Sequence, residues 1–206
     1  PAQDLTAGVT TVYDLPEFST TLAPSTPYKL YYRAVCSDTE KSPWNSSAVF
    51  TTLCSFGTYF SEGFDSSTSM PNCFTKVGTQ GNVSAQSSST AASAPNNLYM
   101  ASEGILSLPP VSNFSAETHR IRFKLKGANT AGGSVLFGYL AVASNPVSFV
   151  PLQTFSANSA TSYEEYSFEP GAAPETGYFA FRQVGSSAVV LDDIVWEAIP
   201  QCSDVI

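Results

Sequence analysis

Two adjacent carboxylates, Asp192 and Asp193, interrupt an apolar segment at residues 188–197. If this segment is a strand, its side chains alternate between two faces, and Asp192 shares one face with Ile194 and Trp196. Asp193 then lies on the opposite face, so at least one carboxylate points into the core. A buried carboxylate without a partner is costly, and a cation or a cluster of hydrogen-bond donors is the usual remedy. A pair of solvated or hydrogen-bonded acids at a strand end is the alternative.

No set of residues in the chain matches a catalytic site. The only histidine, His119, falls on the apolar face of its segment, where a satisfied, half-buried imidazole is the simpler interpretation. Nucleophilic catalysis would need a base beside a serine or cysteine. The acids, such as Glu164 and Glu165, match no carboxylate pair flanking a cleft, as glycoside hydrolysis requires. We therefore predict no catalytic residues, and a hydrolase with an unrecognised carboxylate pair is the alternative.

A ladder of basic side chains alternates with apolar ones in residues 119–126. The basic members are Arg120, Arg122, Lys124 and Lys126. The opposite face carries His119, Ile121, Phe123 and Leu125. This pattern predicts a strand with a solvated outer face whose cations pair with acids on neighbouring strands, such as Glu164-Glu165. Binding of an acidic glycan is the functional alternative, and we assign no ligand to the ladder.

Several aromatic residues could form a platform for sugar rings, although aromatic side chains in sandwiches more often fill the core. The candidates are Tyr139, Phe149, Tyr163, Tyr166 and Trp196. Within residues 163–168, Tyr166 and Phe168 share one face and Tyr163 lies on the other, so Tyr163 is the better exposed candidate. We name Tyr163 and Trp196 as candidate ligand-binding residues, with the ligand unknown.

Composition excludes several classes of protein. The 206 residues are 43% hydrophobic, which excludes disorder, and no apolar run approaches the roughly 20 residues of a membrane-spanning helix. The net charge is −8 with nine Lys and Arg residues, which argues against nucleic acid because phosphate binding needs a basic surface.

The four cysteines, Cys36, Cys54, Cys73 and Cys202, include no C-x-x-C pair, and one histidine cannot build the usual zinc sites. We predict a disulfide between Cys36 and Cys54, because both lie near neighbouring strand ends. Such a bond would contribute about 3 kcal/mol by the chain-entropy model. Other pairings and buried free thiols remain open.

Apolar residues recur with a period of two between clusters of Gly, Pro, Asn and Ser, which predicts an all-β chain. After the first fifty residues the expected strands are 58–64, 73–77, 98–108, 117–126, 134–143, 148–155, 162–168, 177–183 and 188–197. This number of strands suits a two-sheet antiparallel jelly-roll sandwich. Residues 84–95, a run of small polar side chains, are expected to be a mobile surface loop.

Tyr28 ends a loop, Leu22-Ala-Pro-Ser-Thr-Pro-Tyr28, and opens an alternating segment that runs to Cys36. A tyrosine in this position can return its hydroxyl to the backbone a few residues upstream. With Ser42-Pro-Trp44 and Ala48-Val-Phe-Thr-Thr52, residues 1–53 resemble the C-terminal half of a fibronectin type III domain. The resemblance implies that the opening strands of that domain are missing, so we expect the exposed face to pack on the rest of the chain or on a second copy, which would make a dimer.

Residues 54–201 resemble the MAM-like jelly roll of bacterial cleaved-adhesin and choice-of-anchor modules. The resemblance is carried by four motifs, Tyr59-Phe-Ser-Glu-Gly-Phe-Asp65, Met70-Pro-Asn-Cys-Phe74, Leu106-Ser-Leu-Pro-Pro110 and Ala188-Val-Val-Leu-Asp-Asp-Ile-Val195. Phe74 stands where these modules usually have tryptophan. Residues 202–206 would begin a following module.

The resemblance implies a structural calcium ion where the first and last strands of the jelly roll meet. Matched by motif, its ligands would be Glu62, Asp65, Asp192 and Asp193, and carboxylates are the ligands that calcium prefers. The resemblance further implies a non-catalytic module for cell adhesion or carbohydrate or protein binding, with a glycan or a host or surface protein as partner. The parent protein would be bacterial and secreted or anchored at the cell surface. A spacer that positions a catalytic domain elsewhere in the parent is the alternative.

Overall fold

A computed structural model of the chain describes residues 22–34, 36–37, 39–171 and 177–200. The chain divides into two compact units, Pro1–Ser55 and Phe56–Ile206.

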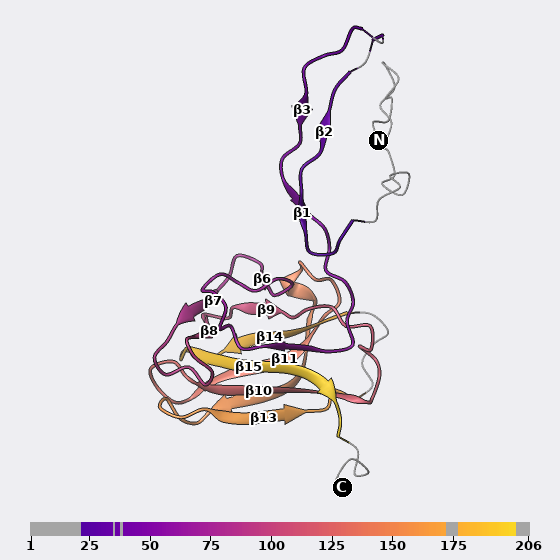
Figure 1. Ribbon diagram of the computed structural model, residues 1–206. Helices are drawn as coiled ribbons and strands as arrows, with labels where there is room; N and C mark the ends of the chain where they lie inside the picture. Colours follow the sequence, from indigo (N-terminus) through magenta and orange to yellow (C-terminus); the bar gives the residue numbers. More distant parts are fainter. Residues whose placement is uncertain (1–21, 35, 38, 172–176, 201–206) are drawn as a thin grey trace. The chain divides into compact units, whose positions relative to one another are not determined.

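The first unit is a long antiparallel ribbon (Figure 1). Its base is formed by β1 (Pro27–Tyr28) paired with β4 (Phe50–Thr51). Farther along, β2 (Tyr31–Tyr32) pairs with β3 (Asn45–Ser46). None of the described residues of this unit is fully buried, and large side chains such as Trp44 remain 56% exposed. A two-stranded ribbon without a core is marginal in water, so this part of the chain needs further contacts for stability.

Tyr28 anchors the base of the ribbon. Its hydroxyl accepts a hydrogen bond of 2.8 Å from the backbone N–H of Ala23, five residues upstream, and its ring lies 6.2 Å from that of Phe50. The predicted return of the Tyr28 hydroxyl to the upstream backbone is thus confirmed. The assignment of this unit to a fibronectin type III domain stays a prediction.

The predicted disulfide between Cys36 and Cys54 is wrong. Cys36 is an exposed free thiol, whereas Cys54 and Cys73 are disulfide-bonded. Cys36 lies at the tip of the ribbon, where its N–H donates to the carbonyl of Glu40, and Cys54 follows β4 at the base. A disulfide requires Cα atoms within about 7 Å, and the length of the ribbon separates these two positions. The alternation of the sequence located strand ends but did not show that they belong to opposite ends of one ribbon.

The second unit consists of two antiparallel sheets packed face to face, which confirms the predicted all-β sandwich (Figure 1). The six-stranded sheet has the order β13-β10-β15-β8-β7, with β5 also paired to β15. Its strands are β13 (Glu164–Phe168), β10 (His119–Gly127), β15 (Val189–Ala198), β8 (Asn96–Ala101), β7 (Asn82–Ser87) and β5 (Phe60–Glu62).

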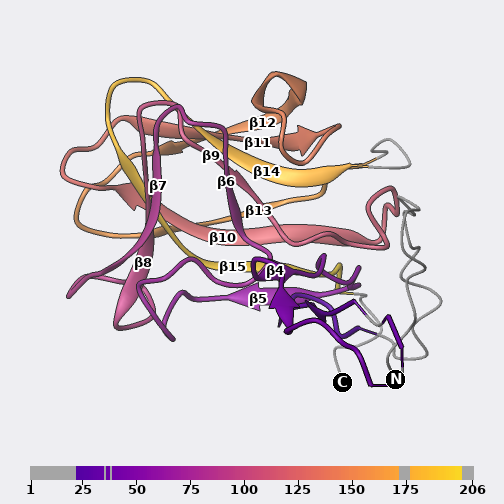
Figure 2. The same cartoon turned by 90° about the horizontal axis from the view of Figure 1, so that it is seen from above.

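The five-stranded sheet has the order β12-β11-β14-β9-β6. Its strands are β12 (Phe149–Ala157), β11 (Gly133–Leu140), β14 (Tyr178–Val184), β9 (Ile105–Ser107) and β6 (Thr75–Val77). Figure 2 shows β11, β12 and β14 in one layer and β10 and β15 in the other. The only helical turn among the described residues is the 3-10 turn η2 (Pro146–Ser148), and no described helix is long and apolar enough to cross a membrane.

The core lies between the sheets and is rich in phenylalanine. Phe123 of β10 contacts Phe181 of β14 with ring centroids 4.8 Å apart, and Phe137 of β11 lies 5.3 Å from Phe179. The side chains that alternation placed on the inner face of β10, Ile121, Phe123 and Leu125, are fully buried. The opposite, outer face of the six-stranded sheet therefore carries the basic ladder.

The expected strand at residues 98–108 is two strands in different sheets. Ser102 and Glu103 have positive φ angles of 53° and 65°, and the chain turns there from β8 to β9. A Cβ on Gly104 would lie 2.5 Å from the carbonyl oxygen of Asn82, so only glycine fits this crossing. The apolar pattern continues through the turn because both strands face the same core.

The expectation of a mobile loop at residues 84–95 is wrong for its first part. Residues 82–87 form β7, which pairs with β8 along its whole length and buries Val83 and Ala85 in the core. Residues 88–95, which we call the strap, then cross back to the start of β8. The small side chains that made the segment look unstructured allow it to lie close to the sheet.

Candidate functional site

A β-bulge in β15 determines which way its two acids point. Lys124 of β10 pairs with Asp192, but Arg122 pairs with Val195, so β15 has one residue more than β10 between these pairs. Asp193 has a φ angle of +48°, as a residue inserted at a bulge can have. The insertion reverses the alternation, and Leu191, Ile194 and Trp196 therefore all face the core. The expectation that Asp192 shares a face with Ile194 and Trp196 is wrong for this reason.

The bulge coincides with a change of strand pairing on the other edge of β15. Residues 189–191 pair with β8, whereas residues 194–196 pair with β5. Between the part paired with β8 and the part paired with β5, this edge of β15 has no neighbouring strand and faces the strap. Asp192 lies at this point. The side chain of Asp192 is completely buried although it belongs to the outer face of the sheet.

Asp192 is held by four donors. Its Oδ2 accepts from the backbone N–H groups of Ala92 at 2.7 Å and Ser93 at 3.2 Å. Its Oδ1 accepts from the Ser93 hydroxyl at 3.2 Å and from the N–H of Asp193 at 2.8 Å. Burial raises the pKa of Asp192, and the backbone hydrogen bonds partly oppose that rise. A buried carboxylate was expected to be stabilised either by a cation or by a cluster of hydrogen-bond donors, and for Asp192 the structure shows the donor cluster.

Asp193 pairs with the basic ladder. Its Oδ2 lies 2.8 Å from the Lys124 ammonium. Burial alone would raise the pKa of Asp193, but hydrogen bonds from Lys124 and Ser93 together with the charges of Lys124 and Arg122 lower it below its ordinary value. The hydrogen bond to Asp193 likewise raises the pKa of Lys124.

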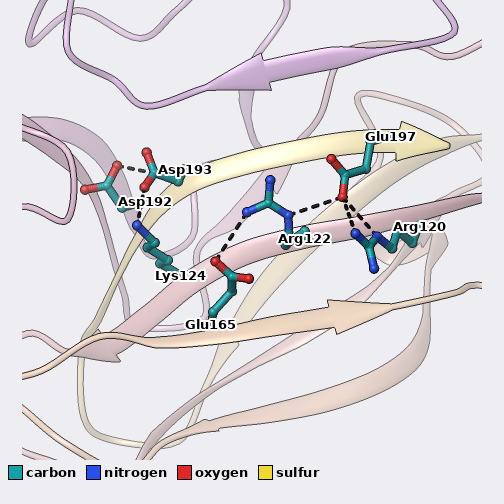
Figure 3. A network of polar contacts seen from close by, with 7 residues as sticks. All are labelled: Arg120, Arg122, Lys124, Glu165, Asp192, Asp193 and Glu197. Carbon is teal, nitrogen blue, oxygen red and sulfur yellow. Dashed lines mark hydrogen bonds and ion pairs between the residues drawn. The ribbon is translucent and has the colours of Figure 1, made fainter. Parts of the chain in front are cut away.

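Arg120 and Arg122 of the ladder are also paired with acids (Figure 3). Glu197 of β15 accepts from Arg120 at 2.7 Å and from Arg122 at 3.2 Å, and Arg122 also reaches Glu165 of β13 at 3.3 Å. Burial opposes ionisation of Glu197, but the hydrogen bonds and charges of the two arginines lower its pKa. The predicted pairing of the ladder with acids on neighbouring strands is therefore confirmed for Arg120, Arg122 and Lys124.

Lys126 differs from the other three basic residues because its side chain is almost fully buried. Its ammonium donates to the Thr90 hydroxyl of the strap at 2.9 Å and lies 4.8 Å from the ring centroid of Tyr163. Burial lowers the pKa of Lys126. The hydroxyl of Tyr163 in turn accepts from the side-chain amide of Asn97 on β8 at 3.1 Å, and burial raises the pKa of Tyr163 to about 12.

Trp196 belongs to the core and cannot serve as an exposed platform. It is 1% exposed, its indole N–H donates to Asn113 Oδ1 at 3.0 Å, and its ring stacks on His119 with centroids 5.6 Å apart. His119 is half-buried, as expected, and its one side-chain hydrogen bond within the described residues is with the Thr118 hydroxyl. Tyr163 remains the half-exposed member of the predicted pair.

Oxygen atoms from three segments converge near Gly63, next to the predicted calcium ligands. A Cβ on Gly63 would lie 2.8 Å from Ser93 Oγ, 2.9 Å from Asp65 Oδ2 and 3.3 Å from Asp193 Oδ1. Glu62 Oε1 accepts from the N–H of Phe64. Within the described part of the chain no group of three or more His, Cys, Asp or Glu side chains is arranged to hold a metal ion. The calcium site therefore stays a prediction, and Asp192, whose oxygens are occupied by donors, is its weakest member.

Sequence reasoning missed the polar residues that complete this face. Thr90, Ser93 and Asn97 contribute hydrogen bonds to Lys126, Asp192 and Tyr163. A pattern search could not find Thr90 and Ser93, because they lie in a run of small residues without periodicity.

No family model and no curated protein matches the chain. Several solved structures have the same fold. The K1 cleaved adhesin domain of Lys-gingipain from Porphyromonas gingivalis aligns with a TM-score of 0.57 and 15% identity over 70% of this chain and 100% of that domain. The K2 cleaved adhesin domain of Lys-gingipain aligns with a TM-score of 0.55 and 18% identity, over 68% of this chain and 98% of that domain. The C-terminal family 22 carbohydrate-binding module of Clostridium thermocellum Xyn10B aligns with a TM-score of 0.52 and 12% identity, over 69% of this chain and 94% of that module.

We expect Asp192→Asn to destabilise the second unit by about 2–3 kcal/mol, because an amide replaces a charged acceptor of several hydrogen bonds and turns one N–H₂ toward the donors. Denaturant unfolding measures this loss, and hydrogen exchange at the Ala92 and Ser93 amides should accelerate. Glu165→Gln, on the exposed edge of the same face, is the control and should cost under about 1 kcal/mol. Equal effects of the two substitutions would contradict the role given to Asp192.

The lowered pKa of Glu197 predicts how its contribution to stability depends on pH. A carboxylate with a depressed folded-state pKa stabilises the fold above its unfolded pKa and loses this contribution as pH falls through the folded value. Glu197→Gln should therefore be less stable than the parent at about pH 6, and the difference should shrink toward about pH 3. Thermal unfolding across this range measures it. A difference that does not change with pH would show that the ion pairs of Glu197 do not stabilise the fold.

Proposed function

We propose that this chain is a non-catalytic binding module of a secreted or surface bacterial protein, acting in adhesion by binding a carbohydrate. The observation that carries the proposal is the jelly-roll fold of the second unit, which recurs in structures described as cleaved adhesin domains and as a carbohydrate-binding module. The half-buried Tyr163 on the outer face of the six-stranded sheet supplies an aromatic surface for such a ligand.

The contacts of the titratable side chains support a binding role over a catalytic one. Asp192 is saturated with donors, Asp193 and Glu197 are paired with cations, and His119 is stacked on Trp196. These contacts hold the groups in structural roles, whereas acyl or glycosyl transfer needs a base or a carboxylate pair that is free to act on a substrate.

The first unit is proposed to be the C-terminal half of a fibronectin type III domain preceding a MAM-like module. Its confirmed Tyr28 contact supports this assignment. Exposed side chains on its ribbon, among them Leu30, Tyr32 and Trp44, need a cover, and a dimer through this unit is one way to provide it.

The function is tested by screening the whole chain against a panel of soluble polysaccharides and host surface proteins, with hydrolysis products followed in parallel. We expect binding to at least one polysaccharide without release of sugars. Absence of binding would favour a spacer role. Turnover that is lost when two neighbouring acids are changed would overturn the non-catalytic assignment.

We also propose a structural calcium ion near Gly63, where oxygen atoms of Asp65, Asp193 and Ser93 converge next to Glu62. Calcium prefers such oxygens. Removing calcium with a chelator should lower the melting temperature, and adding it back should restore the original value. Asp65→Asn should remove most of this response. A melting temperature that ignores both chelator and calcium would remove the ion from the proposal.

A further inference from the structure

Tyr163 lies across the outer face of the six-stranded sheet. It directly precedes β13, yet its hydroxyl bonds to Asn97 of β8, and in the sheet β10 and β15 separate these two strands. On the way its ring passes over the Lys126 ammonium, which lies 4.8 Å from the ring centroid. A cation in this position faces the plane of the ring. One face of the ring is therefore turned to the sheet and the other away from it.

The groups around the ring hold it in place. Asn97 is 1% exposed and Lys126 is 4% exposed, so neither has freedom to move away. Lys126 is fixed in turn by the strap through Thr90. A rigid, flat aromatic ring binds with little loss of conformational entropy, because its rotamer is already set.

Hydrogen-bonding capacity remains at the edge of the ring. The Tyr163 hydroxyl accepts from Asn97, and within the described residues its own proton has no acceptor. Asn97 Oδ1 also has no hydrogen-bond partner there, but it is buried, so the Tyr163 hydroxyl is the group that a ligand can reach. Sugar hydroxyls, which both donate and accept, complement a phenol with a free donor.

The charges on this face are balanced. The four basic residues of the ladder, Arg120, Arg122, Lys124 and Lys126, face four acids on the same sheet, Glu165, Asp192, Asp193 and Glu197. Three of the cations are in ion pairs, and the fourth is buried beneath Tyr163. An anionic glycan would need an unpaired, accessible cation, and it would meet the paired acids at close range.

We propose that the outer face of the six-stranded sheet binds an uncharged, hydroxyl-rich sugar, with one ring stacked on the outward face of Tyr163. This inference rests on the proposed function as a carbohydrate-binding module and adds to it the position of the site and the class of ligand. Tyr163 contacts the sugar and donates from its hydroxyl. Lys126 and Asn97 are positioning residues that keep the ring flat on the sheet.

The test uses affinity electrophoresis and calorimetry of the whole chain with two neutral polysaccharides, xylan and galactomannan, and two anionic ones, polygalacturonate and chondroitin sulfate. We expect binding to a neutral polymer that is unchanged between low and high salt. Tyr163→Ala should weaken this binding about tenfold or more, and Tyr163→Phe should weaken it only a few-fold, because the ring is kept and the donor is lost.

Two control variants separate the site from general effects. Tyr31→Ala removes a tyrosine that is 60% exposed in the first unit and should leave binding unchanged. Glu165→Gln removes one of the two acids paired with Arg122 and should not weaken binding to the neutral polymer. Melting temperatures show whether each variant is folded, and Tyr163→Phe keeps the test valid if Tyr163→Ala is unstable.

The outcomes distinguish this inference from the proposed function. Binding to an anionic polymer that weakens with salt would overturn the neutral-ligand inference and leave the binding function intact. Neutral binding that both Tyr163 variants retain at full strength would overturn the position of the site. No binding to any polysaccharide would overturn the carbohydrate-binding function and this inference together.

Discussion

The buried carboxylate of Asp192 is the interaction on which the second unit depends. A shielded charge of this kind must be surrounded by donors, and the donors come from two places. Ala92 and Ser93 bring the strap onto the sheet, and the N–H of Asp193 is available because the chain bulges there. The same bulge turns Ile194 and Trp196 into the core and leaves Asp193 beside Lys124. The strap, the bulge in β15 and the first pair of the charge ladder therefore meet around one carboxylate.

The sequence was informative wherever a contact is local or periodic. The alternation along residues 119–126 predicted the inner and outer faces of β10 correctly. It could do so because β10 itself contains no inserted residue, so every second side chain faces the core. Tyr28 could be interpreted because its partner Ala23 is five residues away. The all-β class followed from repeated short alternating segments, and charge complementarity with Glu165 followed from placing two such segments side by side.

Three features could not be predicted, each for a physical reason. A single inserted residue at Asp193 shifts the phase of a strand, and the apolar residues on both sides hide the shift. The strap looked unstructured because its partner Asp192 is 100 residues away from Ala92, beyond any local pattern. The cysteine pairing failed because closeness of two strand ends depends on which strands pair, and Cys36 and Cys54 belong to opposite ends of a ribbon.

The position of β15 has a mechanical consequence under the proposed role in adhesion. This strand is hydrogen-bonded to β10 along one edge and to β8 and then β5 along the other. Tension on the chain beyond Ala198 acts along the axis of β15. The hydrogen bonds to the neighbouring strands are then loaded together in shear, and they do not open one at a time. The bulge at Asp193, next to the Asp192 side chain that the strap binds, opposes sliding of the strand. The module would thus resist pulling from that side better than its equilibrium stability alone suggests.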